Sequence, residues 1–173
     1  MKKIVFTTIN VVLFIGHAHA QTCNLKIAAS APNNRYEIVA SSDGSEILDK
    51  QTKLIWQRCS IGQIWDGQSC AGTPSQLTWD KALIKAKALN KGYRLPNIKE
   101  LQSIVEESCH EPAINEKIFP NTNSSRAEAA YWTSSPIPLG NNVWVVDFNN
   151  GSTFFLDKDG SEANAVRAVR SSK

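Results

Sequence analysis

The chain contains 173 residues, of which 19 are Lys or Arg and 16 are Asp or Glu, and its formal net charge is +3 at neutral pH. Lys2 and Lys3 lie in an apolar N-terminal leader, so the rest is nearly neutral and lacks the strongly basic face that nucleic-acid-binding proteins use. A chain of this length suits one domain with its own hydrophobic core.

Residues 1–20 have the pattern of a cleavable secretion signal. Lys2 and Lys3 precede a mostly apolar run, and Ala18-His19-Ala20 is the small-x-small sequence at which signal peptidase cleaves. A membrane anchor is disfavoured, because spanning a bilayer takes about 20 apolar residues. No other segment is apolar and long enough to span a membrane. We expect a periplasmic or secreted protein, cleaved near Ala20.

All four cysteines follow this leader, and an even number in an oxidising compartment favours two disulfides. Four cysteines allow three pairings. We favour Cys59 with Cys70, because that bond closes a short loop around Trp65, and it leaves Cys23 to pair with Cys109. A zinc site is disfavoured because the usual C-x2-C spacing and His partners are missing. No metal ion or cofactor is expected.

The first elements after the leader are predicted to be strands. Residues 21–34 are rich in Ala, Ser and Asn and are expected to form a weakly ordered lead-in to one domain over residues 35–173. Residues 35–40 alternate as a strand does, and Ser41-Ser-Asp-Gly44 is a turn sequence before a short return strand. A further strand begins at Leu54-Ile-Trp56.

Two helices are predicted next. Thr78 can cap the first, whose apolar face is formed by Trp79, Ala82, Leu83, Ala86 and Leu89. Asn97 caps the second, and Glu100 three residues later completes a capping box. The inner face of the second helix is predicted to hold Ile98, Leu101, Ile104, Val105 and Ser108.

Strands return after a loop over residues 111–129. They are expected at residues 131–134, 143–148, 152–156 and 165–170. Asn149-Asn150-Gly151 is a turn of the Asn-Gly kind that joins the strands of a hairpin. The order of strands, two helices and strands predicts an α+β fold with a mainly antiparallel sheet.

Several motifs along the chain, in this order, resemble one bacterial family. They include Leu54-Ile-Trp-Gln-Arg-Cys59, Gly62-Gln-Ile-Trp-Asp-Gly67, Arg94-Leu-Pro-Asn-Ile-Lys-Glu-Leu101, Tyr131-Trp-Thr-Ser-Ser135 and Val143-Trp-Val-Val-Asp-Phe148. The family is the Lcl C-terminal domain-like family, named from a collagen-like adhesin, and the resemblance covers about residues 43–170. Lys53 departs from it, because a Gly is usual there.

This resemblance implies a compact fold similar to C-type lectin-like domains, in which the terminal strands pair. It also implies a role in adhesion or in binding glycans, with sulfated polysaccharide as the leading ligand.

Trp65 is the strongest single candidate for a ligand contact, together with Asp66 beside it. Both lie in a Gly-rich loop that we expect the Cys59–Cys70 disulfide to hold rigid and exposed. The alternative is that Trp65 packs as a lid over the core. The other four tryptophans, Trp56, Trp79, Trp132 and Trp144, are expected in the core.

Basic residues form the second candidate group. Lys81, Lys85, Lys87, Lys91, Arg94 and Lys99 could make a patch that attracts sulfated polysaccharide, with Arg58 as a further candidate beside the first disulfide. The alternative is an ordinary solvated helix face, which the small net charge favours.

The sequence offers little for catalysis. His110 is the only histidine outside the leader, and the cysteines are expected to be paired, so a base and a thiolate nucleophile are both in doubt. A carboxylate-based hydrolase using Glu106, Glu107 or Glu111 is the remaining enzymatic alternative.

We therefore predict an exported, non-enzymatic binding or adhesion domain for a polysaccharide or a surface protein. The alternative is a structural or protein-interaction module of the envelope or of a pilus. A homo-oligomer would have to assemble through the globular surface, because no collagen-like or coiled-coil stalk is present.

Overall fold

The computed structural model describes residues 21–138 and 140–172, so the predicted secretion signal lies outside the described residues. The elements are β1 (Thr22–Cys23), β2 (Tyr36–Ile38), β3 (Glu46–Asp49), β4 (Leu54–Gln57), β5 (Ile64–Trp65), β6 (Cys70–Ala71), α1 (Trp79–Ala88), α2 (Ile98–Gln102), β7 (Cys109–His110), β8 (Ala130–Pro136), β9 (Asn142–Asp147), β10 (Thr153–Asp157) and β11 (Val169–Ser171). Short 3-10 turns occupy Asn33–Arg35 and Ala40–Ser42.

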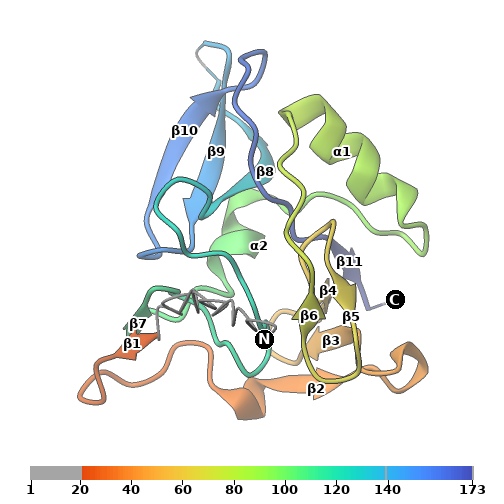
Figure 1. Cartoon of the computed structure of the whole chain (residues 1–173), viewed down its shortest axis with the longest axis vertical. Helices are drawn as coiled ribbons and strands as arrows, with labels where there is room; N and C mark the ends of the chain where they lie inside the picture. The colour runs from red at the N-terminus through yellow and green to blue at the C-terminus, as the bar shows by residue number, and fades with distance from the viewer. Residues whose placement is uncertain (1–20, 139, 173) are drawn as a thin grey trace, which may run out of the picture.

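The strands form small sheets whose named strands all pair antiparallel. One sheet has the order β11-β4-β3-β2 and another the order β10-β9-β8, while β1 pairs with β7 and β5 with β6. Figure 1 shows the β8–β10 sheet at the upper left and the other large sheet at the lower right, with α2 near the centre. The predicted mixed fold with antiparallel sheets, two helices and two disulfides is confirmed.

The two ends of the described chain join different sheets. The last strand, β11, pairs with β4 through Val169 and Trp56, and the first strand, β1, pairs with β7. The first strand of the predicted domain, β2, lies in the same sheet as β11 but at its opposite edge, so the pairing of terminal strands that the family resemblance implied is not direct.

The core consists of two clusters of buried side chains. Trp56 belongs to the first and Trp132 to the second, and neither side chain has any exposed surface. Each such side chain contributes about 1.5–3 kcal/mol by leaving water. Trp79 and Trp144 are only partly buried, although both were expected in the core.

Helix α2 is much shorter than its apolar stripe suggested. It ends at Gln102, because the Ser103 hydroxyl donates to the Glu100 carbonyl and the backbone then pairs with residues 113–114. Ile104 and Val105 are still buried, but Ile104 lies in the turn after the helix and Val105 forms an isolated β-bridge with Ile114. The predicted continuation of the helix to Ser108 is therefore wrong.

The two helix starts differ in how they are capped. Asn97 and Glu100 form the predicted capping box, with each side chain bonded to the other's backbone N–H at 2.8–2.9 Å. Thr78 stands at the N-cap of α1, but its hydroxyl donates to the Asp80 carboxylate and makes no capping hydrogen bond. The prediction of a Thr78 side-chain cap is corrected by this contact.

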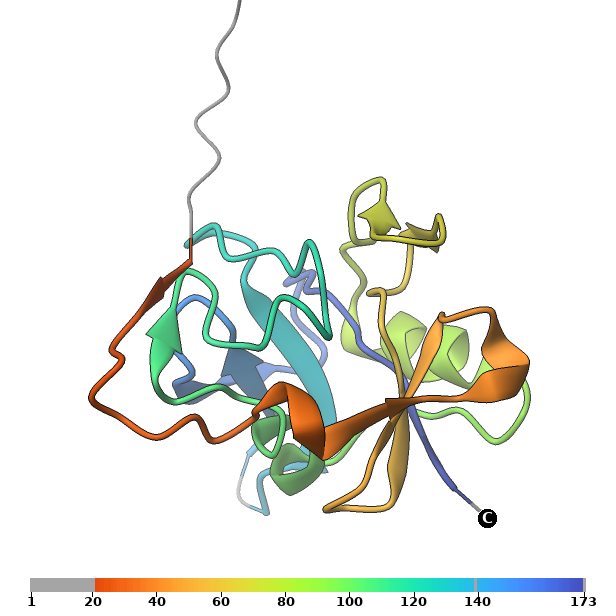
Figure 2. The same cartoon turned by 90° about the horizontal axis from the view of Figure 1, so that it is seen from below.

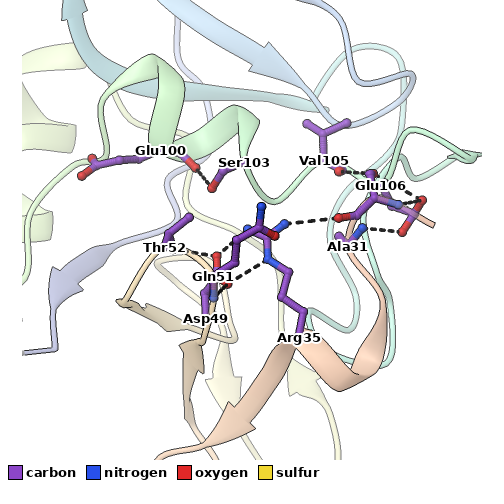
Figure 3. A network of polar contacts seen from close by, with 10 residues as sticks. Ala31, Arg35, Asp49, Gln51, Thr52, Glu100, Ser103, Val105 and Glu106 are labelled. Atoms are coloured by element: carbon purple, nitrogen blue, oxygen red, sulfur yellow. Dashed lines mark hydrogen bonds and ion pairs between the residues drawn. The ribbon is translucent and has the colours of Figure 1, made fainter. Parts of the chain in front are cut away.

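The segment before β2 is attached to the domain rather than weakly ordered. Glu106 accepts hydrogen bonds from the backbone N–H groups of Ser30 and Ala31 at 3.0 and 2.9 Å (Figure 3). Arg35 donates to Asp49 at 2.8 Å in the same network. Ala31 is fully buried, so the expectation for residues 21–34 is corrected.

None of the helices described is both long enough and apolar enough to span a bilayer.

Candidate functional site

The structure contains both disulfides that the sequence suggested. Cys59 and Cys70 are bonded with their Cα atoms 5.4 Å apart, and Cys23 is bonded to Cys109. The Cys59–Cys70 bond closes the β5–β6 hairpin, which stands apart from the β2–β4 strands in Figure 2. This hairpin carries Trp65 and Asp66.

Trp65 attaches the hairpin to the body of the protein. Its ring lies 4.0 Å from the Arg58 guanidinium, and its indole N–H donates to the Asp43 carbonyl at 3.0 Å. The ring also covers Gly44, where a Cβ atom would lie 3.1 Å from the indole nitrogen. Trp65 is therefore only partly exposed, and one ring face is occupied by a cation–π contact.

Arg58 and Asp66 are also engaged within the protein. Arg58 is buried and donates to the carbonyls of Ile118, Gly44 and Lys117 at 2.8, 3.2 and 2.9 Å, and burial lowers its pKa. Asp66 is exposed, and its carboxylate accepts the Ser69 and Gln68 backbone N–H groups, which lower its pKa. Both side chains thus stabilise the loops that surround them.

The lysines of α1 lie on two different flanks of the helix. At 3.6 residues per turn, Lys81 and Lys85 are separated by roughly 40°, whereas Lys85 and Lys87 are separated by roughly 200°. All three are exposed, and the buried face between the flanks holds Ala82 and Ala86. The predicted basic patch is thus divided, and Lys81 and Lys85 face away from Lys87.

Lys87 belongs to a hollow of about 650 Å³ at the C-terminal end of α1, which we call the helix cleft. Its lining residues are Leu83, Lys87, Asn90, Lys91, Gly92, Tyr93, Arg94, Leu95 and Ser134. Three cationic side chains thus surround a surface that is largely apolar. The sequence predicted Lys87, Lys91 and Arg94 as ligand-binding candidates. It did not indicate that Leu83, Tyr93, Leu95 and Ser134 would line the same cleft, because they come from separate segments of the chain.

A sharp turn after α1 brings Lys91 to the cleft. Asn90, Lys91 and Gly92 all have left-handed backbone angles, with φ values of 59°, 49° and 81°. Gly and Asn adopt this region readily, whereas Lys does so at some cost. The Tyr93 N–H closes the turn by donating to the Asn90 carbonyl at 2.9 Å. The Lys91 side chain remains 64% exposed.

Two carboxylates hold the cations of the cleft in place. Glu100 accepts both guanidinium arms of Arg94 at 2.7 Å, and Glu46 lies 3.5 Å from Lys91 and 2.6 Å from Arg170. Burial opposes ionisation of Glu46 and Glu100, but the bonds from Arg170 and Arg94 outweigh it, so the pKa of each carboxyl is lowered. The charge of Arg94 is therefore largely balanced, whereas Lys87 forms no ion pair among the described residues.

The candidates for chemistry lie elsewhere. The His110 imidazole is 3.9 Å from the Glu111 carboxylate, and both side chains are about half exposed. Glu106 is committed to the Ser30 and Ala31 backbone. Within the described part of the chain, no cluster of His, Cys, Asp and Glu is arranged to hold a metal ion.

Comparison with known families identifies the domain type. A family model described as the Lcl C-terminal domain matches residues 45–170, which include the helix cleft and the Cys59–Cys70 loop. The family resemblance noted from the sequence motifs is thereby confirmed. No curated protein matches the chain.

Proposed function

Because the chain belongs to the Lcl C-terminal domain family, we propose that it is an exported, non-enzymatic binding domain for a sulfated polysaccharide. The observation that carries the proposal is the helix cleft, where Lys87 and Lys91 stand exposed beside a largely apolar floor. Sulfate esters are permanent anions, which complement the two lysines. The C–H faces of sugar rings are apolar and complement the floor of the cleft.

The compartment is part of the same proposal. Two disulfides and a domain of this family fit a periplasmic or extracellular protein, because disulfides persist in oxidising environments. We propose that residues 1–20 direct the export. A C-type-lectin-like fold is likewise proposed, and it is supported by the two helices between β4 and β8 and by the return of β11 to β4.

Retention on immobilised heparin, with neutral dextran as the control matrix, tests the proposed ligand class. We expect the oxidised protein to be retained on heparin only and to elute as salt screens the charges. Replacing Lys87 and Lys91 by Gln should weaken heparin binding about tenfold, or about 1.4 kcal/mol. The pair Lys26→Gln and Lys50→Gln removes the same charge from exposed lysines outside the cleft and should change affinity less than twofold.

Two results would contradict this proposal. One is absence of retention at low salt, and the other is an equal loss of affinity in the Lys26 and Lys50 control. A third double variant, Lys81→Gln with Lys85→Gln, compares the other flank of α1. An effect from this flank as large as that of Lys87 and Lys91 would place the ligand along the helix rather than in the cleft.

A protein-interaction module of the envelope is the second candidate. Ile64, on the β5–β6 hairpin, is 73% exposed, so a large apolar side chain on a disulfide-braced loop is available to a partner protein. An Ile64→Ser variant should then lose partners from a pull-down of the envelope fraction while it keeps its heparin affinity. A variant that keeps all its envelope partners would contradict this second candidate.

A further inference from the structure

A second cavity, separate from the helix cleft, lies between the loop of residues 121–126 and the segments that carry Glu111 and Asn149. It is an open hollow of about 470 Å³, and every residue that lines it has a polar or charged side chain. The side chains used in the argument are Glu111, Asn121, Ser124, Ser125, Arg126 and Asn149. We call it the loop cavity.

Hydrogen bonds hold the walls of the loop cavity in position. The Asn121 amide donates to the Cys70 carbonyl at 2.8 Å, and the Asn149 amide donates to the Ser124 carbonyl at 2.7 Å. The Glu111 N–H donates to the Asn149 carbonyl at 2.7 Å. Each Asn side chain donates one amide N–H to this frame, and no described residue donates to either amide oxygen.

Two opposite charges line the cavity without pairing. Arg126 is exposed and forms no ion pair in the described part of the chain. Glu111 has only the His110 imidazole near it, at 3.9 Å. An unpaired guanidinium can bind a planar carboxylate with two parallel hydrogen bonds. The Glu111 carboxylate and the two amide oxygens are free to accept hydrogen bonds from a ligand.

A buried cation lies directly behind the cavity. Arg167 is completely buried, and it donates to the hydroxyl of Thr122, a lining residue, at 2.8 Å. Its other hydrogen bonds are to backbone carbonyls and to the Ser60 hydroxyl, its guanidinium lies over the Phe119 and Tyr131 rings, and no described carboxylate pairs with it. Because no described carboxylate neutralises Arg167, its positive charge favours an anionic group in the cavity.

From this arrangement we infer that the loop cavity binds a carboxylated saccharide unit of the hexuronic acid class. The Arg126 guanidinium binds the carboxylate, and the positive charge of Arg167, which lies behind Thr122, attracts it. The ring hydroxyls donate to Glu111 and to the amide oxygens of Asn121 and Asn149, and they accept from the Ser124 and Ser125 hydroxyls. A simple anion would leave these acceptors without donors, and a neutral sugar would leave Arg126 without a partner.

This site stands independently of the helix cleft, so the two can be tested separately. Sodium glucuronate is titrated into the ¹⁵N-labelled, oxidised protein and followed by NMR chemical shifts. Amides of residues 121–126 and of Asn149 should shift in a saturable manner. Methyl glucoside and sodium acetate serve as neutral and sugar-free probes, and each should bind at least tenfold more weakly.

Two variants decide the outcome. Arg126→Gln should weaken glucuronate binding at least tenfold. The variant should keep its fold, which its spectrum checks, since Arg126 is exposed and makes no ion pair within residues 21–138 and 140–172. Lys87→Gln, in the helix cleft, should change that affinity less than twofold. The inference is overturned by unsaturable or absent shifts, by acetate or the glucoside binding as well as glucuronate, or by equal effects of the two variants. Heparin also contains hexuronic acid, so the variants separate the two sites: heparin binding in the helix cleft falls on replacement of Lys87 and Lys91, and glucuronate binding in the loop cavity falls on replacement of Arg126.

Discussion

At the scale of single residues, the most consequential side chain is Arg167, a buried cation that pairs with no carboxylate among the residues described by the structure. Its guanidinium lies 4.9 Å from the Phe119 ring centre and 5.8 Å from that of Tyr131, and it donates to the carbonyls of Gln57 and Arg58. Burial lowers its pKa. The aromatic faces and the carbonyl oxygens together replace the water that the charge has lost.

Replacing Arg167 by Met should therefore destabilise the protein by about 3 kcal/mol, because carbonyl and hydroxyl groups would lose their donor in the core. Urea unfolding of the oxidised protein measures this. The same change at the exposed Arg126 should alter the free energy of unfolding by less than about 0.5 kcal/mol. Equal effects at the two positions would show that Arg167 is not needed to satisfy its neighbours.

Glu46 joins three parts of the chain and should make stability depend on pH. Its carboxylate is almost fully buried and pairs with Arg170 and Lys91, and the pKa of Glu46 is lowered in the folded protein. A lowered folded-state pKa contributes stability above the ordinary carboxyl value of about 4.3, and this contribution is lost as the pH falls through the folded-state pKa.

Glu46→Gln should accordingly cost about 2 kcal/mol at pH 7 and progressively less between pH 5 and pH 3. Asp49, Glu100 and Glu106 also have lowered pKa values and contribute to the acid sensitivity of both proteins. The difference between wild type and variant in urea unfolding isolates Glu46. A difference that stays constant with pH would contradict the assignment.

At the scale of elements, the short helix α2 depends on its start more than on its length. The capping box of Asn97 and Glu100 satisfies two backbone N–H groups, and the same Glu100 carboxylate holds Arg94 at the helix cleft. Five residues are too few for an isolated helix to persist in water, so the cap and the packing of Leu101 must stabilise it.

Asn97→Ala should lower the free energy of unfolding by about 1 kcal/mol, because the cap hydrogen bond to the Glu100 N–H is lost. Thr78→Ala at the start of α1 is the matched comparison, and it should cost less, since Thr78 donates to Asp80 rather than capping the helix. Thermal and urea unfolding of both variants check the order. A larger loss of stability for Thr78→Ala would show that Thr78 stabilises the start of α1 even though it makes no capping hydrogen bond.

At the scale of the whole molecule, the two disulfides constrain the chain over very different lengths. Cys23 and Cys109 are 86 residues apart and join the N-terminal segment to the body, whereas Cys59 and Cys70 are 11 residues apart within one hairpin. The entropy that a cross-link removes from the unfolded chain grows with the logarithm of loop length.

Replacing both Cys23 and Cys109 by Ser should therefore cost about 4–5 kcal/mol, and replacing Cys59 and Cys70 about 3 kcal/mol. Urea unfolding of the two double variants measures the difference. Heparin affinity should survive the loss of Cys23–Cys109, because the helix cleft lies within residues 83–134 and does not include the N-terminal segment. A greater loss of stability in the hairpin variant would contradict the chain-entropy argument.

The sequence by itself determined the features that depend on residues close together in the chain or on an even number of cysteines. These are the mixed class with antiparallel sheets, the capping box at Asn97, the Asn149–Gly151 hairpin turn, the two disulfides and the family. Each rests on local backbone preferences, on the number of cysteines, or on motif order. None of them depends on knowing which distant residues are in contact in the folded protein.

Only the tertiary structure decided which charges are available to a ligand. Arg58 and Arg167 are buried, Arg94 is balanced by Glu100, and the lysines of α1 are divided between two flanks. The helix cleft joins Lys87 to Ser134, which are distant in the chain. Such arrangements follow from how the sheets and helices pack, because burial and long-range hydrogen bonds, rather than residue type or spacing, determine where a charged side chain lies.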